Sequence, residues 1–265
     1  MRMRKTTLAP LAVLALLGMG SVLLPFAGTA RSADDEALTK ALRAAMEAPD
    51  RPADDKARDE DRVPVEKLNF FGLRPDMRVL EIMPGGGWFT RLLAPTLRDK
   101  GKLYVAVGTK RVKENLLGKA PFDKVSVLAE DITLTPTAQR GIFDVPELSF
   151  KEKDLDAALT FRNLHNLSPQ GRANLNKAVF AALKPGGIYG VVDHTRRHNE
   201  PDNPENGRRM DPVRAIHEAE QAGFVFEDYS DIVYHADDEL RYEVGRRAVA
   251  GNTDRFILRF RKPKS

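Results

Sequence analysis

The sequence predicts an α/β protein built on a mostly parallel sheet with helices on both faces. Two observations carry this prediction. From residue 77 to residue 263, short apolar runs alternate with helical segments, and strands joined by helices in this way form parallel sheets. In addition, the glycine-rich stretch VLEIMPGGGWFT at residues 79–90 directly follows the first apolar run. Sheets of this kind bind their ligands at such turns, beyond the carboxyl ends of the strands.

The first 30 residues have the layout of a secretory signal peptide. MRMRK is basic, the next 21 or so residues are apolar, and Gly28, Thr29 and Ala30 are small residues suited to cleavage. We expect residues 1–30 to be removed, with cleavage as late as residue 33, and the protein to be periplasmic. The alternative is an uncleaved helix that anchors the chain in the inner membrane, because the apolar run is near the lower length of a spanning helix. No other membrane contact is expected.

Charge and composition exclude several classes of function. Four basic residues and no acid lie in the first 33 positions, so their removal leaves 38 basic residues against 38 acidic ones. A neutral domain gives no argument for nucleic acid as a partner. The chain has no cysteine, which excludes a disulfide, a thiolate nucleophile and a cysteine metal site.

Residues 34–76 are expected to form an N-terminal helical extension ahead of the main domain at residues 77–265. Leu38, Leu42 and Met46 repeat at helical spacing, and Pro52 and Pro64 mark further helix starts.

Charged residues in this extension also follow helical spacing. Asp55, Asp59 and Arg62 lie along one such stretch, with Arg58 beside them. One interpretation is a solvated, ion-paired helix. The other is that Arg58 and Arg62 close over the functional site and bind an anionic group.

Seven apolar runs define the expected strands of the main domain. They are MRVLEI, KLYVAV, KVSVLA, LDAALTF, GIYGVVD, FVFEDYS and RFILRFR. Two helices are expected after Ser168 and Asp211, each followed by proline, and KPGG at residues 184–187 should end the first helix and turn into a strand. The polar segment at residues 195–212 is long enough for a lid or binding loop, and its arginines are expected to be exposed.

The glycine-rich stretch can serve a ligand or only a turn. Glycines let the backbone approach a ligand without interference from a Cβ atom, and the amides of the following helix start face that ligand. Glu81, at the end of the strand, can accept hydrogen bonds from a polar or cationic ligand group. Without a ligand, the same residues make a tight connection between strand and helix.

Several motifs resemble those of class I S-adenosylmethionine-dependent methyltransferases. LEIMPGGGWFT resembles the family's first motif, acid-x-Gly-x-Gly-x-Gly. ALKPGGIYGVVD is similar to its helix, turn and fifth strand, and DRFILRFRKP to its seventh strand, which runs antiparallel. The resemblance covers roughly residues 65–263 and implies a Rossmann-like, seven-stranded methyltransferase sheet. More narrowly, LTFRNLHN and TDRFILRFRKP look like a group of exported bacterial proteins described as predicted methyltransferases.

The resemblance implies roles for particular residues. Glu81 would orient the methionine end of the cofactor, and Asp131 would lie near the adenine amino group. The cofactor's loop would be lined by Pro84, Gly85, Gly86 and Gly87. Phe161, Arg162 and Asn163 would lie under the transferred methyl group and the substrate. Trp88, the sole tryptophan, is expected in the wall of the cofactor pocket.

Two positions depart from the family pattern. Met83 replaces the first glycine of the motif and should crowd the turn. Gly108 stands where the family usually has an acid that binds the ribose hydroxyls, and losing it removes about 1.5–3 kcal/mol of charge-assisted hydrogen bonding.

Two histidines follow the fourth and fifth strands and should face the cleft. His165 or His194 can act as a general base, and Asp193 can orient one of them. Each histidine can equally be a satisfied polar residue at a strand end. With His198 added the group could hold a metal, but its spacing matches no zinc pattern, and we expect no metal.

The predicted function is an S-adenosylmethionine-dependent methyltransferase acting on a small molecule outside the cytoplasm. Asn163 joins the two histidines as a candidate catalytic residue. The alternative is an exported binding protein that keeps the fold and has lost the cofactor, which Met83, Gly108 and export all favour. A nicotinamide-dependent oxidoreductase is disfavoured because no acid ends the second strand. Substrate, acceptor atom and oligomeric state stay open.

Overall fold

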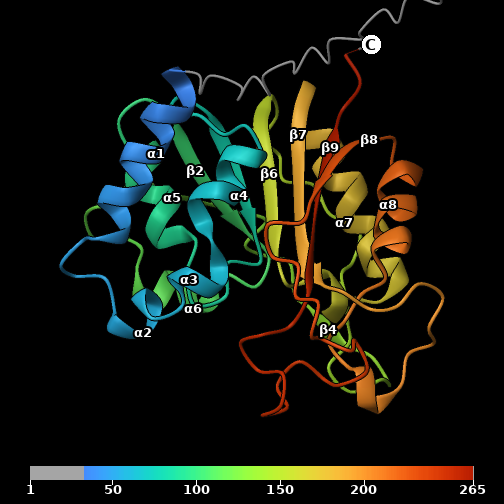
Figure 1. The fold of residues 1–265 in the computed structure, drawn as a ribbon. Coiled ribbons are helices and arrows are strands. Elements are labelled where there is room, and N and C mark those ends of the chain that lie inside the picture. The colour runs from blue at the N-terminus through green and yellow to red at the C-terminus, as the bar shows by residue number, and fades with distance from the viewer. Residues whose placement is uncertain (1–32, 265) are drawn as a thin grey trace, which may run out of the picture. The chain divides into compact units, whose positions relative to one another are not determined.

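Seven strands form one sheet in the order β3-β2-β1-β6-β7-β9-β8 (Figure 1) in a computed structural model that describes residues 33–264. β1, β2, β3, β6 and β7 pair in parallel, and β9 is antiparallel to both β7 and β8. The predicted seven-stranded sheet with an antiparallel last strand is therefore confirmed. Its strands are Arg78–Ile82 (β1), Lys102–Ala106 (β2), Ser126–Leu128 (β3), Leu155–Phe161 (β6), Leu183–His194 (β7), Val225–Ser230 (β8) and Arg255–Arg261 (β9).

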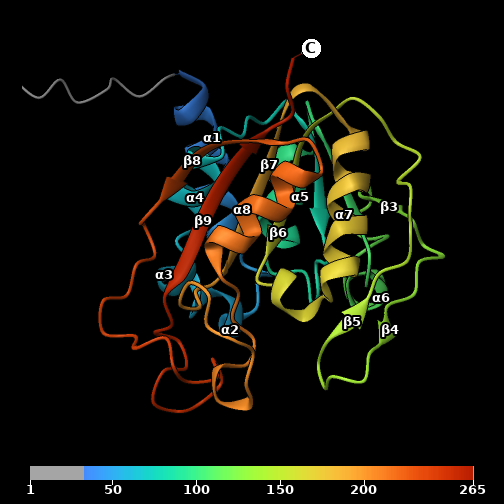
Figure 2. The same cartoon turned by 90° about the vertical axis from the view of Figure 1, so that its right-hand side faces the viewer.

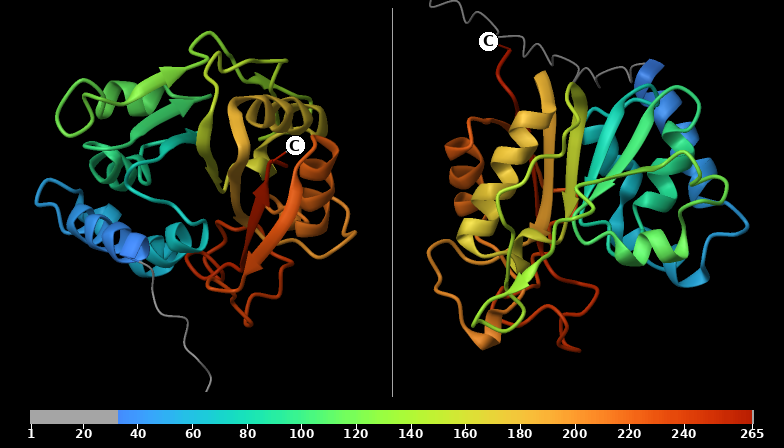
Figure 3. Two further views of the ribbon diagram at one scale, coloured as in Figure 1. Left: turned by 90° about the horizontal axis from the view of Figure 1, so that it is seen from above. Right: turned by 180° about the vertical axis from the view of Figure 1, so that it is seen from behind.

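Helices cover both faces of this sheet. Neighbouring residues of a strand point to opposite faces, and both faces carry apolar side chains that need to be buried. Leu80 and Ile82 of β1 pack toward α7 and α8, whereas Val79 packs toward α1, α4 and α5. Figure 3, viewed from above, shows the blue and the orange helices on opposite sides of the strands. The helices are Ala33–Met46 (α1), Ala53–Lys56 (α2), Asp59–Arg62 (α3), Pro64–Phe70 (α4), Thr90–Leu97 (α5), Lys110–Asn115 (α6), Pro169–Ala182 (α7) and Pro212–Gln221 (α8), with short 3-10 turns at Leu164–Asn166 (η1) and Pro204–Asn206 (η2).

The N-terminal extension shares a core with the sheet. Leu38 and Leu42 are fully buried in the cluster that contains Val79, as their spacing predicted. Pro52 precedes α2 and Pro64 is the first residue of α4. The charged stretch between these prolines is divided between α2 and α3 rather than forming one helix.

Both predicted helix caps are present. The Ser168 side chain accepts a hydrogen bond from the Gly171 N–H, and Asp211 accepts one from the Val213 N–H. The KPGG stretch differs from its prediction, because β7 already begins at Leu183 and includes it. The register with β6 shifts beyond Leu155, so the extra residues are absorbed as an irregularity within the strand.

Two connections were not foreseen as structural features. β4 (Thr135–Pro136) and β5 (Phe143–Asp144) form a two-stranded sheet between β3 and β6. Residues 231–254 join β8 to β9 without a helix or strand. This segment and the loop after β7 lie at the same end of the sheet as α2 and α3 (Figures 1 and 2). The site described below is at this end.

The predicted signal peptide lies outside the described residues. Within residues 33–264, no helix is both long and apolar enough to cross a membrane.

Candidate functional site

A cavity of about 710 Å³ lies at the carboxyl ends of β1 and β6. These neighbouring strands mark the point where the strand order reverses, since β2 and β3 lie to one side and β7, β9 and β8 to the other. Open α/β sheets bind ligands at this switch point, and the volume is typical of a small-molecule site. The wall comes from the extension, the glycine turn and the segments that follow β6, β7 and β8.

Two glycines of the turn face the cavity. Pro84, Gly85 and Gly86 line it. Gly85 has φ +58°, and a Cβ atom added there would meet nothing within 4 Å. At Gly86 a Cβ would meet only the mobile end of Arg111, at 3.5 Å. The backbone is thus bare on the cavity side, as the ligand interpretation of the stretch requires.

Gly87 serves packing instead. It has φ +84°, and a Cβ atom would come within 2.3 Å of Leu116 Cδ1. Gly87 is not among the described residues that line the cavity. Only glycine fits here, because both the backbone conformation and the neighbouring side chain exclude a Cβ atom.

Met83 takes the left-handed conformation, with φ +54°, which glycine adopts without strain. Its N–H donates to Ala106 O at 2.9 Å, and its carbonyl accepts from Asn163 Nδ2 at 3.1 Å. These bonds hold the turn against the neighbouring strands despite the unfavourable φ.

Glu81 is buried at the end of β1, with 2% of its surface exposed. The Thr90 hydroxyl donates to Glu81 Oε2 at 2.6 Å. Burial raises the pKa of Glu81 to about 7, because a low-dielectric environment disfavours the carboxylate, and the Thr90 hydrogen bonds only partly oppose this. Glu81 therefore titrates near neutral pH at the cavity wall.

Trp88 lines the cavity as expected, but its contacts fix it rather than leave it free to stack on a ligand. Its Nε1 donates to Asp55 O at 3.0 Å. The guanidinium carbons of Arg51 and Arg62 lie 5.0 Å and 4.5 Å from its ring centroid. Phe89 packs edge-on against it. Trp88 therefore joins the glycine turn to the extension.

The residues after β6 reach the cavity together. Phe161, Arg162 and Asn163 all line it. The Phe161 ring stacks on Phe89 at 3.6 Å between centroids. Arg162 has φ +62° and is held by its N–H to Val192 O at 2.7 Å.

The two histidines lie side by side at the ends of β6 and β7, with ring centroids 5.8 Å apart, and both line the cavity. His165 Nδ1 lies 2.5 Å from Asp193 Oδ1, and the buried Asp193 also accepts from the backbone N–H groups of both histidines. A carboxylate accepts hydrogen bonds only, so Nδ1 of His165 carries the proton and its Nε2 is an acceptor when the ring is neutral.

His194 has a different environment. Its Nδ1 is 2.8 Å from the Thr253 hydroxyl. Burial, followed by the charges of His165 and Arg162, moves the pKa of His194 far below its usual range. His194 is therefore neutral at physiological pH.

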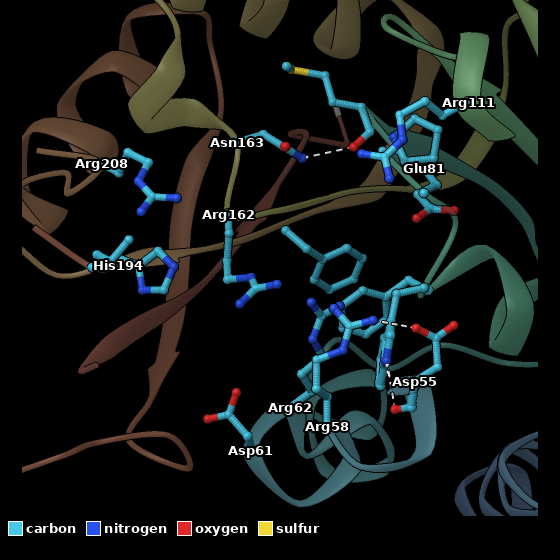
Figure 4. Close-up of a pocket in the computed structure, with 18 of the residues that line it drawn as sticks. Asp55, Arg58, Asp61, Arg62, Glu81, Arg111, Arg162, Asn163, His194 and Arg208 are labelled. Atoms are coloured by element: carbon cyan, nitrogen blue, oxygen red, sulfur yellow. Dashed lines mark hydrogen bonds and ion pairs between the residues drawn. The ribbon is translucent and has the colours of Figure 1, made fainter. Parts of the chain in front are cut away.

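Arginines dominate the charge of the wall. Among the described residues, six arginines and four carboxyl groups line the cavity, the arginines being Arg58, Arg62, Arg91, Arg111, Arg162 and Arg208. Arg58 and Arg62 thus take the place that the second interpretation of the extension predicted (Figure 4). The expectation of exposed loop arginines is wrong for Arg196 and Arg209, which are 4% and 3% exposed. Arg209 forms a fully buried ion pair with Asp238 that ties the loop after β7 to residues 231–254.

Some predicted residues lie elsewhere, and some lining residues were missed. Asp131 is exposed and Gly108 borders a different hollow, so neither lines the cavity in the described part of the chain. The missed residues include Asn115 of α6 and a group from the segment after β8, namely Val244, Gly245, Gly251 and Thr253. No local pattern marks them. Among residues 33–264, no group of three or more His, Asp or Glu side chains is placed to hold a metal ion.

Solved structures share this fold. A SAM-dependent methyltransferase from Aquifex aeolicus aligns with a TM-score of 0.54 and 17% identity over 83% of this chain and 97% of its own. A chain from the Haloferax volcanii complex of the Trm112 methyltransferase activator with a protein assigned as a methyltransferase aligns with a TM-score of 0.51 and 14% identity, over 88% and 98%. No protein-family model and no curated protein matches the chain. The chain therefore has the class I methyltransferase fold.

Glu81→Gln should stabilise the protein at alkaline pH. The folded-state pKa is raised from 4.5 to about 7, so folding favours the protonated carboxyl, and stability is lost as pH rises from about 4.5 through 7. Above pH 7 this loss is about 3 kcal/mol, and glutamine avoids it. Urea unfolding at pH 5 and pH 8 measures the effect. A difference between variant and wild type that does not grow with pH contradicts the assignment.

Gly87→Ala should destabilise the fold by about 1–3 kcal/mol, because the new Cβ overlaps Leu116 in a left-handed backbone. Gly86→Ala is the matched control, and it should cost little because its Cβ meets only the end of Arg111. Thermal unfolding of both variants is the measurement. Equal losses at the two positions would show that packing does not distinguish these glycines.

Proposed function

We propose that this protein transfers a methyl group from S-adenosylmethionine to a small molecule outside the cytoplasm, with His165 as the general base. One observation carries the proposal: the bare glycine turn and the His165–Asp193 pair meet in one cavity at the point where the strand order reverses. The likeness of the fold to the SAM-dependent methyltransferase from Aquifex aeolicus supports the choice of cofactor.

The residues present fit this cofactor. Gly85 and Gly86 leave the backbone open to a ligand, and Glu81 offers a carboxylate at the strand end for a polar or cationic group. Phe161 and Asn163 extend the same wall toward the histidines. S-adenosylmethionine supplies an electrophilic methyl group on a sulfonium centre. The end of β2 provides no acid, so the ribose is held without a charge-assisted bond from that position.

His165 is the better base of the two histidines. Asp193 fixes its ring and keeps the proton on Nδ1, so Nε2 takes the proton of a hydroxyl or amine as that group becomes a nucleophile. Asp193 also stabilises the imidazolium that results. The lowered pKa of His194 makes it a poor proton acceptor, and its neutral ring instead contributes a wall that does not repel a cationic cofactor.

S-adenosylhomocysteine should bind the purified protein, and Gly86→Val should abolish that binding while the fold persists. Between pH 6 and pH 8 the wild-type affinity should rise about tenfold, because Glu81 ionises with a pKa of about 7 and the ionised form is the acceptor. Glu81→Gln should bind more weakly and lack this dependence. Calorimetric titration measures all three.

The opposite outcome of the titration is informative. If the wild type shows no binding at millimolar ligand, the glycines serve only the turn. The protein is then a binding protein that keeps the fold without the cofactor.

Export is the second part of the proposal. The basic, apolar and small-residue order of residues 1–30 supports it. We expect the mature chain to begin near Arg31 or Asp34, and N-terminal sequencing of the periplasmic fraction checks this. An intact Met1 in the inner membrane would support the anchored alternative.

A further inference from the structure

We propose that the methyl acceptor is an anion whose carboxylate or phosphate oxygens bind the guanidinium groups of Arg62 and Arg162. That the bound anion accepts a methyl group rests on the proposed function. That an anion binds here rests on the geometry of the cavity. It assigns the substrate class that the fold alone leaves open.

The two arginines come from distant parts of the chain and converge. Arg62 ends α3 in the extension, and Arg162 follows β6. In Figure 4 the side chain of Arg162 points toward those of Arg62 and Arg58, with His194 to one side and Glu81 to the other. Arg162 holds this position with φ +62°, a conformation that costs a non-glycine residue energy and that is common at functional sites.

Neither arginine has an ion-pair partner in the part of the chain that the structure describes. Arg62 is only 8% exposed, and its Nε has no hydrogen-bond partner. Among residues 33–264, no hydrogen bond or ion pair joins the side chain of Arg62 or Arg162 to another group. Arg62 contacts the ring of Trp88, which orients its guanidinium without neutralising it.

The neighbouring carboxylates are already engaged. Asp55 pairs with Arg58 and with Arg91, the latter at 3.2 Å. Asp61 pairs with Arg255. The acids near the cluster therefore compensate other cations.

Of the other acids nearby, Asp54 is exposed to solvent, and two more are paired. Asp59 pairs with Arg51 at 2.5 Å, and Asp193 is bound to His165. The positive charge of Arg62 and Arg162 is left for a ligand.

Burial makes this arrangement unfavourable without an anion. Burial, followed by the charges of Arg162 and Arg58, lowers the pKa of Arg62 to about 9. Burial and then the charge of Arg255 lower the pKa of Arg162. Buried cations are normally paired, and arginine's planar fork matches carboxylate and phosphate oxygens. An oxyanion between the two guanidinium groups satisfies both.

The oxyanion could come from the cofactor's own carboxylate or from the acceptor. Its position favours the acceptor, because in Figure 4 the side chain of Arg162 lies beside His194, whereas Glu81 lies on the other side of the cavity. An anion held there places the rest of the molecule near the His165 base.

Titration with inorganic phosphate, with and without saturating S-adenosylhomocysteine, tests the proposal. Wild-type protein should bind phosphate with similar affinity in both conditions. Arg62→Gln and Arg162→Gln should each weaken phosphate binding at least about tenfold and leave S-adenosylhomocysteine affinity within about threefold. Arg162→Lys should retain part of the phosphate affinity, because it keeps the charge and loses the fork. Arg98→Gln, which removes a surface arginine paired with Asp123, is the control and should bind phosphate as the wild type does.

Other outcomes overturn the inference. Competition between phosphate and S-adenosylhomocysteine, or loss of both ligands in the arginine variants, would assign the cluster to the cofactor's carboxylate. Absence of phosphate binding in the wild type would remove the site altogether. Melting temperatures accompany each titration, and Arg62→Gln and Arg162→Gln should not lower them, because each removes a charge that has no ion-pair partner within residues 33–264. Phosphate binding without S-adenosylhomocysteine binding would contradict the proposed cofactor and keep the anion site.

Discussion

The hydrogen bond from Trp88 Nε1 to Asp55 O is the contact on which the site depends. It joins the start of the helix after the glycine turn to the extension, and the ion pair between Arg91 and Asp55 connects the same two segments. Arg51 and Arg62 cover the Trp88 ring. Through this contact the extension forms one wall of the cavity. The extension also packs in the core on one face of the sheet, which holds that wall in place.

The cavity concentrates charges that cost stability. Within residues 33–264, the buried Glu81 is compensated only by hydrogen bonds from Thr90, and Arg62 is buried without an ion-pair partner. Neither buried charge is explained by stability, since uncharged residues of the same size would make the folded protein more stable. The Glu81 carboxyl group and the Arg62 guanidinium lie in different parts of the cavity (Figure 4). A ligand with a positive or polar end and a negative end would satisfy both, as a cationic cofactor and an anionic acceptor bound together would.

Local patterns predicted the seven strands of the main sheet and the helix caps, because each depends on a few neighbouring residues. The residues that line the site were harder to predict from the sequence. Gly86 and Gly87 are adjacent and chemically identical, yet one faces the cavity and the other packs on Leu116; only the three-dimensional contacts separate them. Arg208 and Arg209 are likewise adjacent, and one lines the cavity while the other is buried against Asp238. Thr253 lines the site next to His194. The two residues are too far apart in the sequence for any spacing pattern to connect them.

The pairing of Asp193 with His165, and not with its neighbour His194, follows from the strand itself. Adjacent residues of β7 face opposite sides of the sheet, so Asp193 reaches η1 while the His194 ring faces the cavity. His194 is left with a hydroxyl partner and with Arg162 close enough to lower its pKa. An anion beside Arg162 opposes that effect on His194, because it cancels part of the positive potential at that ring. The arginine that binds the proposed substrate and one of the two histidines that line the cavity are therefore coupled electrostatically.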